Sequence, residues 1–110
     1  MGNLIGAGNG RTYEDFQKQI PEPVKPLFDK LRTYCNSLDE KVIEDVRMHR
    51  VVFCKTMTFR WFADLEPTQS SIIIKIQKER KIEPTVLEVT PKQKLSEIES
   101  RLKDAFTTIR

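Results

Sequence analysis

The sequence predicts an α+β fold, a two-layer sandwich in which an antiparallel sheet of three to four strands is flanked in sequence by two helices. Apolar residues recur with a helical period of about 3.6 near both ends of the chain. Between these segments they recur with a period of two, which is typical of strands. Short connections favour an antiparallel meander, and two one-sided helices can cover one of its faces.

We expect residues 1–20 to form a flexible arm that contains one short helix, and residues 21–110 to form a single α+β domain. The opening "MGNLIGAGNGR" is rich in glycine, as flexible termini often are. Thr12 is a suitable N-cap for a short helix in the arm. One face of that helix would hold Tyr13, Phe16 and Ile20.

The first long helix is expected to begin near Pro26, because proline is tolerated only in the first turn of a helix. Its apolar stripe consists of Leu27, Phe28, Leu31, Tyr34, Cys35 and Leu38. Residues 39–48 favour a turn followed by a short strand, with a short helix as the alternative.

The stretch "HRVVFCKTMTFRWFADLEP" begins at His49 and changes the pattern to strict alternation. It predicts two strands, and "SIIIKIQKE" and "PTVLEVT" predict two more. In the second strand, alternation places Arg60, Phe62 and Asp64 on the outer face. The expected core residues of the sheet are Phe59, Trp61, Ile72, Ile74 and Ile76.

The second long helix is predicted from Thr90 as its N-cap and Pro91 as its first residue. From Leu95 onward the apolar residues keep a helical spacing to the end of the chain.

The net charge of +3 is unevenly distributed. Residues 47–62 hold four basic and no acidic residues, and residues 71–82 have an excess of three positive charges. If the strands in these segments pair, their charges could form one basic patch that attracts phosphates or an acidic partner. The alternative is an ordinary solvated outer face of the sheet.

These observations predict a non-enzymatic binding module that contacts nucleic acid or an acidic protein through the outer sheet face. Stacking on an aromatic side chain together with positive charge is how single strands are often bound. A second hypothesis is a homodimer joined through the same face. The candidate binding residues are Arg50, Lys55, Arg60, Phe62, Lys75 and Lys78.

An enzyme is not expected, and the sequence predicts no catalytic residue, metal site or cofactor. His49 is the only histidine, so it is the only candidate general base near neutral pH. A metal-dependent nuclease is the weaker alternative, with Asp64 on one strand and Glu79 and Lys81 after the next. Cys35 and Cys54 lack metal-ligand spacing and are expected to be a reduced, buried pair.

The chain has no apolar run near the roughly 18 residues that a membrane helix requires. Its beginning also lacks the basic and apolar regions of a secretory signal. We therefore expect a cytoplasmic protein with no membrane partner.

Three runs, "VKPLFDKLRTYCNSLDEKVIED", "VVFCKTMTFRWFADLEP" and "SIIIKI", carry a family resemblance. Together they resemble a small prokaryotic domain of unknown function. That domain is found alone or appended to predicted restriction-type nucleases, and is sometimes labelled a predicted transport protein. The resemblance covers about residues 24–109. The matching residues are Phe28, Leu31, Leu38, Val42, Lys55, Phe62, Pro67 and Ile72 to Ile76.

This resemblance implies an accessory or recognition module and assigns no catalytic residue. The sequence departs from the family pattern around residues 80–84, where that domain often has a longer loop.

Overall fold

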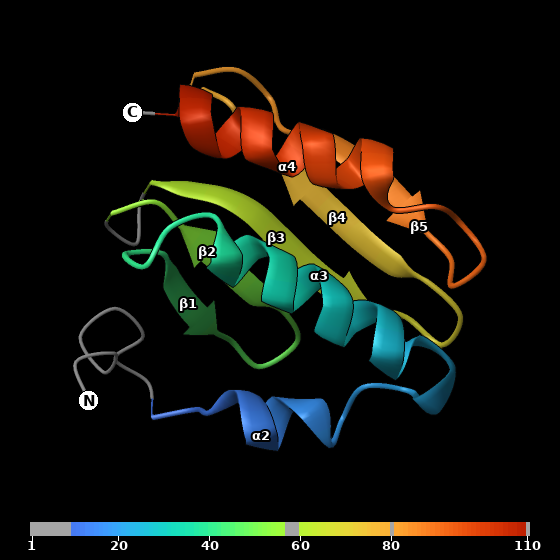
Figure 1. The fold of residues 1–110 in the computed structure, drawn as a ribbon. Coiled ribbons are helices and arrows are strands. Elements are labelled where there is room, and N and C mark those ends of the chain that lie inside the picture. The colour runs from blue at the N-terminus through green and yellow to red at the C-terminus, as the bar shows by residue number, and fades with distance from the viewer. Residues whose placement is uncertain (1–9, 57–59, 80, 110) are drawn as a thin grey trace.

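The computed structural model describes residues 10–56, 60–79 and 81–109. They form an α+β structure in which helices flank an antiparallel sheet in the chain order. The two long helices, α3 and α4, lie side by side over the same face of the sheet (Figure 1). The fold class predicted from the sequence is confirmed in this respect.

Within residues 10–56, 60–79 and 81–109, three helical segments precede the sheet and one helix follows it. These segments are α2 (Tyr13–Gln17), the 3-10 helix η1 (Glu22–Val24), α3 (Lys25–Ser37) and α4 (Ser96–Thr108). The strands are β1 (Ile43–Val46), β2 (Val51–Cys54), β3 (Trp61–Pro67), β4 (Ile72–Ile76) and β5 (Thr85–Val89).

The sheet has five strands in the order β1-β2-β3-β4-β5, so each strand pairs with its neighbours in sequence. All four pairings are antiparallel. The prediction of three to four strands was therefore slightly wrong. The additional strand is β1, which follows a turn in segment 39–48, as favoured from the sequence of that segment. It forms where Asp45 and Val46 pair in register with Val52 and Val51.

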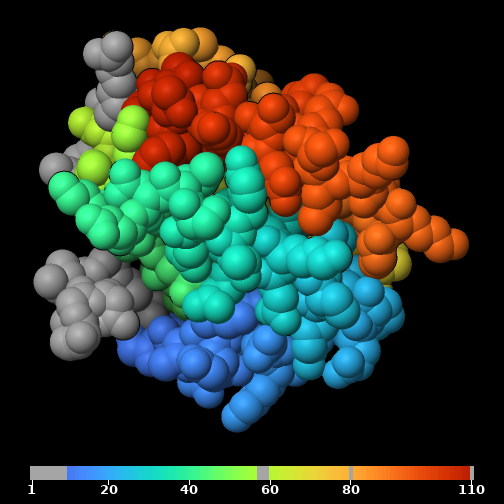
Figure 2. All heavy atoms as spheres, viewed as in Figure 1, coloured from blue at the N-terminus to red at the C-terminus, as the bar shows by residue number. Residues whose placement is uncertain are grey.

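The hydrophobic core lies between the sheet and the long helices. Ile72, Ile74 and Ile76 of β4 point into it, as their alternation predicted, and are almost completely buried. Phe28 and Leu31 of α3 belong to the same core and are fully buried. In Figure 2 the atoms of α2, α3 and α4 cover most of this side of the molecule.

The short helix α2 packs on α3 and lies beyond the β1 side of the sheet (Figure 1). The ring of Tyr13 stacks on that of Phe28, with 6.2 Å between the ring centroids, and the hydroxyl of Tyr13 donates a hydrogen bond to Asp29. Gln17 Nε2 donates to both oxygens of Asp29 at 3.0 Å. This polar contact joins the predicted arm to the body of the domain.

The same region is held to β1 by an ion pair. Arg32 of α3 donates two hydrogen bonds to the carboxylate of Glu44, and its Cζ lies 3.9 Å from the centroid of the Tyr13 ring. Burial and the hydrogen bond to Asp29 raise the pKa of the Tyr13 hydroxyl, so this group stays protonated.

Helix α4 begins at Ser96, six residues after the predicted N-cap Thr90. The predicted start of the helix was wrong, because Thr90 begins a turn that Gln93 closes. The Thr90 backbone N–H donates to Gln93 Oε1 at 2.8 Å, while the Gln93 N–H donates to the Thr90 carbonyl oxygen at 3.1 Å.

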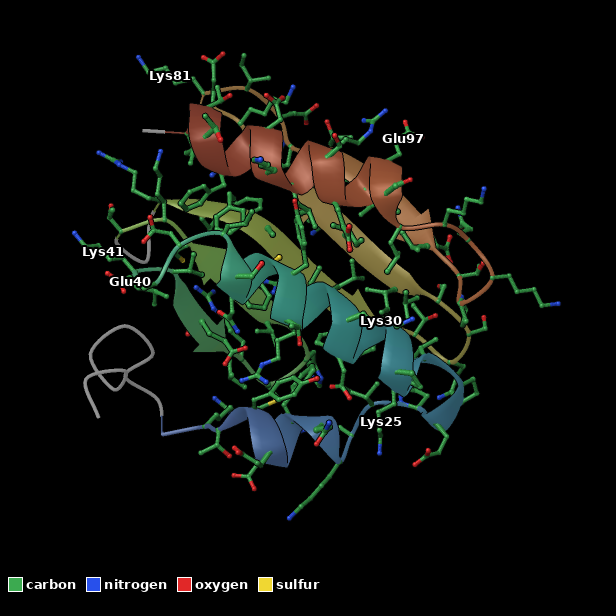
Figure 3. The ribbon with its side chains drawn as sticks, in the orientation of Figure 1. Lys25, Lys30, Glu40, Lys41, Lys81 and Glu97 are labelled. Atoms are coloured by element: carbon green, nitrogen blue, oxygen red, sulfur yellow. The ribbon has the colours of Figure 1, made fainter. Side chains whose placement is uncertain are left out.

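Charged side chains gather on the periphery of the helical layer and the loops. Figure 3 shows Glu40, Lys41, Lys81 and Glu97 at the edge of the protein. Such a distribution is that of an ordinary solvated surface, so the candidate site has to be sought elsewhere.

Candidate functional site

The candidate site is the outer face of the sheet, which is the face opposite α3 and α4. The register places Asp45, Val52, Asp64, Lys75 and Val86 in one row across the five strands. Side chains alternate along a strand, so this row points away from the core residues.

A second row lies next to the first, toward the β1–β2 turn. It contains Glu66 of β3, Ile73 of β4 and Glu88 of β5. Ile73 is the cross-strand partner of both Glu66 and Glu88. Arg47 and Arg50 continue the row on the β1 side, because the Arg47 N–H donates to the Arg50 carbonyl oxygen at 2.8 Å. We call the whole face of the sheet on which these two rows lie the outer face.

A β-bulge reverses the predicted placement of two aromatic residues. Trp61 pairs with Cys54 and Ala63 pairs with Phe53, so Phe62 is the extra residue on β3. The bulge turns Phe62 into the core, where it is fully buried and packs edge-on against Phe106 of α4 at 5.3 Å between ring centroids. The predictions that Phe62 lies on the outer face and Trp61 in the core are both wrong.

Trp61 pairs across the sheet with a residue of the outer face and is only half-buried. It therefore takes the place that the sequence assigned to Phe62. Its backbone carbonyl accepts a hydrogen bond of 2.9 Å from Gln77 Nε2. Phe59, the other aromatic predicted for the core, lies outside the described residues.

Lys55 is directed toward the C-terminal end of α4. Its Nζ donates to the carbonyl oxygen of Ile109 at 3.1 Å and lies 5.1 Å from the centroid of the Phe106 ring. The candidate role of Lys55 in a sheet-face patch is therefore not supported by its position, because the side chain satisfies helix carbonyls.

Two further candidates also lie away from the outer face. Lys78 forms an exposed ion pair with Asp104 of α4, with 2.6 Å between Nζ and Oδ2. Arg60 directly precedes β3, is half-buried, and accepts a hydrogen bond of 3.0 Å from the Lys55 N–H through its backbone carbonyl. The six candidates are thus not brought together into one patch.

Arg50 and Lys75 are the predicted cations that do lie on the outer face, and both are close to Asp64. Arg50 Nε lies 3.5 Å from Asp64 Oδ2, and Lys75 is the cross-strand partner of Asp64. The Asp64 residue is only 8% exposed. Burial raises the pKa of its carboxyl, and the positive charges of Arg50 and Lys75 oppose this rise without cancelling it.

The outer face also contains acidic residues, which the net charges summed over residues 47–62 and 71–82 did not reveal. Asp45 is buried and pairs with Arg47, with 2.9 Å between Oδ2 and Nη2. Glu88 accepts a hydrogen bond of 2.6 Å from the Ser71 hydroxyl. The acidic residues of the two rows are Asp45, Asp64, Glu66 and Glu88, and the basic ones are Arg47, Arg50 and Lys75. The face is therefore close to neutral and not basic.

Sequence reasoning missed Arg47, Asp45 and Trp61 as members of this face. Asp45 and Arg47 could have been found, since residues two apart on a strand share a face and their charges are opposite. Trp61 could not have been found by alternation alone, because the bulge breaks the alternation beside it.

The geometry does not assemble the nuclease site that the sequence offered as an alternative. Asp64 lies in the middle of β3, whereas Glu79 is an exposed residue beyond the end of β4. Within the part of the chain that the structure describes, no group of three or more His, Cys, Asp or Glu residues is arranged to hold a metal ion.

Both cysteines are buried thiols and form no disulfide. Burial raises the pKa of Cys54 to about 12 and that of Cys35 still further. A thiol with a raised pKa is a poor nucleophile, so these positions are typical of packing. Among the described residues, no helix has the length and apolar character needed to cross a membrane.

Comparisons with protein-family models, with curated proteins and with solved structures gave no match. The resemblance to a small prokaryotic domain of unknown function therefore stays a prediction that rests on the residues quoted for it.

Proposed function

We propose that the protein is a non-enzymatic binding module that forms a homodimer through the outer face of its sheet. The observation that supports this most directly is the separation of charge across that face. Arg47 and Arg50 lie on the β1–β2 side, and Glu88 lies on β5. Apolar side chains of Ile73, Val86 and Trp61 lie on the same face, with Val86 59% exposed.

A second copy of the chain fits this pattern. If a two-fold axis runs along β3, each β1 strand lies over the β5 strand of the other copy. Arg47 of one copy then meets Glu88 of the other, and the reverse pair forms by symmetry. Two sheets that pack face to face in this way align within about 30° and bury the apolar side chains between them.

Nucleic acid is the less favoured partner. Phosphates would meet the four outer-face carboxylates as well as the cations, and Arg50 and Arg47 are already paired with Asp64 and Asp45. Nucleic-acid surfaces are strongly positive because affinity depends on neutralising phosphates. Tryptophan and arginine, by contrast, are enriched where proteins contact one another.

Sedimentation velocity across a concentration series tests the dimer. We expect the wild-type protein to form a dimer, and Ile73→Lys to weaken association by roughly tenfold or more, because it places an unpaired charge in the apolar part of the interface. Ile82→Lys is the matched control, since Ile82 is exposed in the loop before β5 and not on the outer face. Each variant's unfolding curve shows whether the fold is retained.

A charge exchange makes the test specific to the proposed symmetry. Arg47→Glu and Glu88→Lys should each weaken the dimer, and the double variant should restore part of the affinity. A wild-type protein that stays monomeric at high concentration contradicts the homodimer. If that monomer binds DNA or RNA with a strong salt dependence that Lys75→Glu reduces, the outer face binds nucleic acid instead.

A further inference from the structure

The charged residues of the outer face are distributed unevenly from strand to strand. Those on β3, Asp64 and Glu66, are both acidic. The nearest basic residues lie to either side, with Arg50 directly before β2 and Lys75 on β4. Because β3 is the middle strand of the sheet, carboxylates occupy the centre line of the outer face and cations occupy its flanks.

A single guanidinium lies beside both of these carboxylates. Arg50 Nε is 3.5 Å from Asp64 Oδ2. Arg50 also stands opposite Glu66 when the register of the β2–β3 pair is continued by one residue. Asp64 is almost completely buried, and this burial raises the pKa of its carboxyl. The centre of the outer face therefore resists a full negative charge already in the single chain.

Within the described part of the chain, the charged groups that face Asp64 all belong to the sheet side, because α3 and α4 pack on the other face. The complete set is Asp45, Arg47, Arg50, Glu66 and Lys75. Asp45 and Arg47 form an ion pair with each other. Arg50 and Lys75 are therefore the cations that offset the carboxylates on β3.

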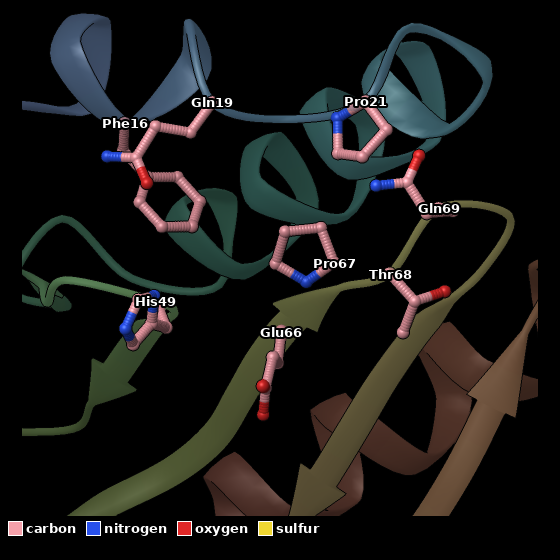
Figure 4. A pocket seen from close by; sticks show the side chains of 8 residues that line it. All are labelled: Phe16, Gln19, Pro21, His49, Glu66, Pro67, Thr68 and Gln69. Carbon is pink, nitrogen blue, oxygen red and sulfur yellow. The ribbon is translucent and has the colours of Figure 1, made fainter.

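His49 is a second group near the outer face that matters for a response to pH, because histidines as a class change charge between about pH 5 and 8. Figure 4 shows His49 in the turn before β2, at the same end of the sheet as Glu66. Both side chains border one pocket there. A response to pH therefore has to be assigned to Asp64 or to His49 by substitution.

The proposed homodimer places like carboxylates opposite each other. Its two-fold axis runs along β3, so rotation about this axis brings each residue of β3 over the same residue of the second copy. Asp64 then faces Asp64, and Glu66 faces Glu66. Lys75 of the second copy lies over Val52, which is displaced from Asp64 by one strand, or about 4.8 Å. The nearest charged group that the second copy brings to Asp64 is therefore a carboxylate.

We propose that this homodimer takes up a proton at the pair of Asp64 carboxyls when it forms, so that association through the outer face is stronger at lower pH. This coupling rests on the proposed homodimer and adds its regulation. Contact between the two sheets removes the water that remains around both groups. A proton that comes from the solvent and binds one Asp64 oxygen removes the repulsion, and the resulting O–H donates to the carboxylate across the axis.

The direction of the effect follows from which state binds more protons. The dimer holds one proton that two separate chains release near neutral pH, so a fall in pH favours the dimer and a rise favours the monomer. One proton per dimer corresponds to a dissociation constant that rises by up to about tenfold for each unit of pH. The dependence is confined to the range between the pKa of Asp64 in the separate chain and its pKa in the dimer.

Sedimentation equilibrium of the full chain from about pH 5 to 8 measures this dependence. Asp64→Asn keeps the size of the side chain and cannot ionise, so its dissociation constant should stay nearly constant over this range. Asp104→Asn is the matched control, because Asp104 is an exposed residue of α4 and does not lie on the outer face. This control and His49→Gln should both retain the dependence of the wild type. The unfolding curve of each variant shows whether it is folded at each pH.

A carboxyl NMR titration of the wild type provides a measurement that needs no variant. The pKa of Asp64 should be higher at protein concentrations at which the dimer predominates than in dilute monomer. An equal or lower pKa in the dimer overturns the coupling.

The outcomes separate the coupling from the homodimer itself. A dissociation constant that is independent of pH, or that falls as the pH rises, overturns the coupling and leaves the homodimer in place. A dependence that survives Asp64→Asn or disappears in His49→Gln assigns the proton to another group and also overturns the coupling. A protein that is monomeric at every pH and concentration overturns the homodimer and the coupling with it.

Discussion

The Nζ atom of Lys55 lies 3.1 Å from the carbonyl oxygen of Ile109, so a residue after the end of β2 holds the C-terminal end of α4. The same ammonium group lies 3.5 Å from the carbonyl oxygen of Thr107 and near the Phe106 ring. Carbonyls in the last turn of a helix have no partner within the helix, and a cation there also interacts favourably with the helix dipole.

We therefore expect Lys55→Met to lower the free energy of unfolding by about 1–2 kcal/mol, the usual contribution of a hydrogen bond to a charged group. Urea unfolding measures this loss. Lys81→Met removes a charge from an exposed loop and should change stability by less than about 0.5 kcal/mol. Equal effects of the two substitutions would show that Lys55 does not hold the helix.

The two aromatic residues at the bulge, Phe62 and Trp61, are expected to contribute very different amounts to stability. Phe62→Ala should cost about 3–5 kcal/mol, since it removes a fully buried ring and its edge-on contact with Phe106. Trp61→Ala should cost less than half of this value, because the Trp61 side chain is only half-buried. Chemical denaturation of both variants provides the comparison, and a larger loss for Trp61→Ala would contradict the placement of the bulge.

The helices α3 and α4 and the strand β4 followed from local patterns, apart from the start of α4, because their apolar periods depend only on which side of the element meets the core. The residues of the candidate site could not be predicted from local patterns, because their positions depend on how the strands pair. One extra residue at the bulge exchanges Trp61 and Phe62, and both are aromatic, so no residue type marks the exchange.

The charges were misjudged for a related reason. Lys55 and Lys78 have partners on α4, more than twenty residues further along the chain. The charge sum over residues 47–62 counted cations without the acidic residues that the neighbouring strands place beside them. Arg50 and Asp64 meet only because β2 and β3 pair in this register.

The contact between α2 and α3 can be tested at a single oxygen atom. Tyr13→Phe removes the hydroxyl that donates to Asp29 and retains the stacked ring, so it should cost about 1 kcal/mol. Hydrogen exchange of the α2 amides should accelerate more than that of the β4 amides, because the lost contact joins only α2 to the body. Tyr34→Phe is the control, since the Tyr34 hydroxyl makes no hydrogen bond within the described ranges. Equal acceleration in α2 and β4 would mean that α2 is not held independently.

The raised pKa of the Asp64 carboxyl predicts how the free energy of unfolding depends on pH. Burial raises the pKa of its carboxyl in the folded protein, so the folded state retains the proton to a higher pH than the unfolded state does. The contribution of this group to stability is therefore fully present below the unfolded-state pKa of about 3.9 and is lost as the pH rises through the folded-state pKa. Asp64→Asn cannot ionise, so its free energy of unfolding should increase relative to that of the wild type over the same range.

Urea unfolding of the wild type and Asp64→Asn at a series of pH values measures this difference. A further substitution tests the cause of the shift: Arg50→Met removes a positive charge that lowers the pKa of Asp64, so the folded-state pKa should rise further in this variant. A carboxyl NMR titration of Asp64 follows this change directly. Two unfolding profiles that stay parallel, or an Asp64 pKa that falls in Arg50→Met, would show that burial does not dominate the electrostatics at the centre of the outer face.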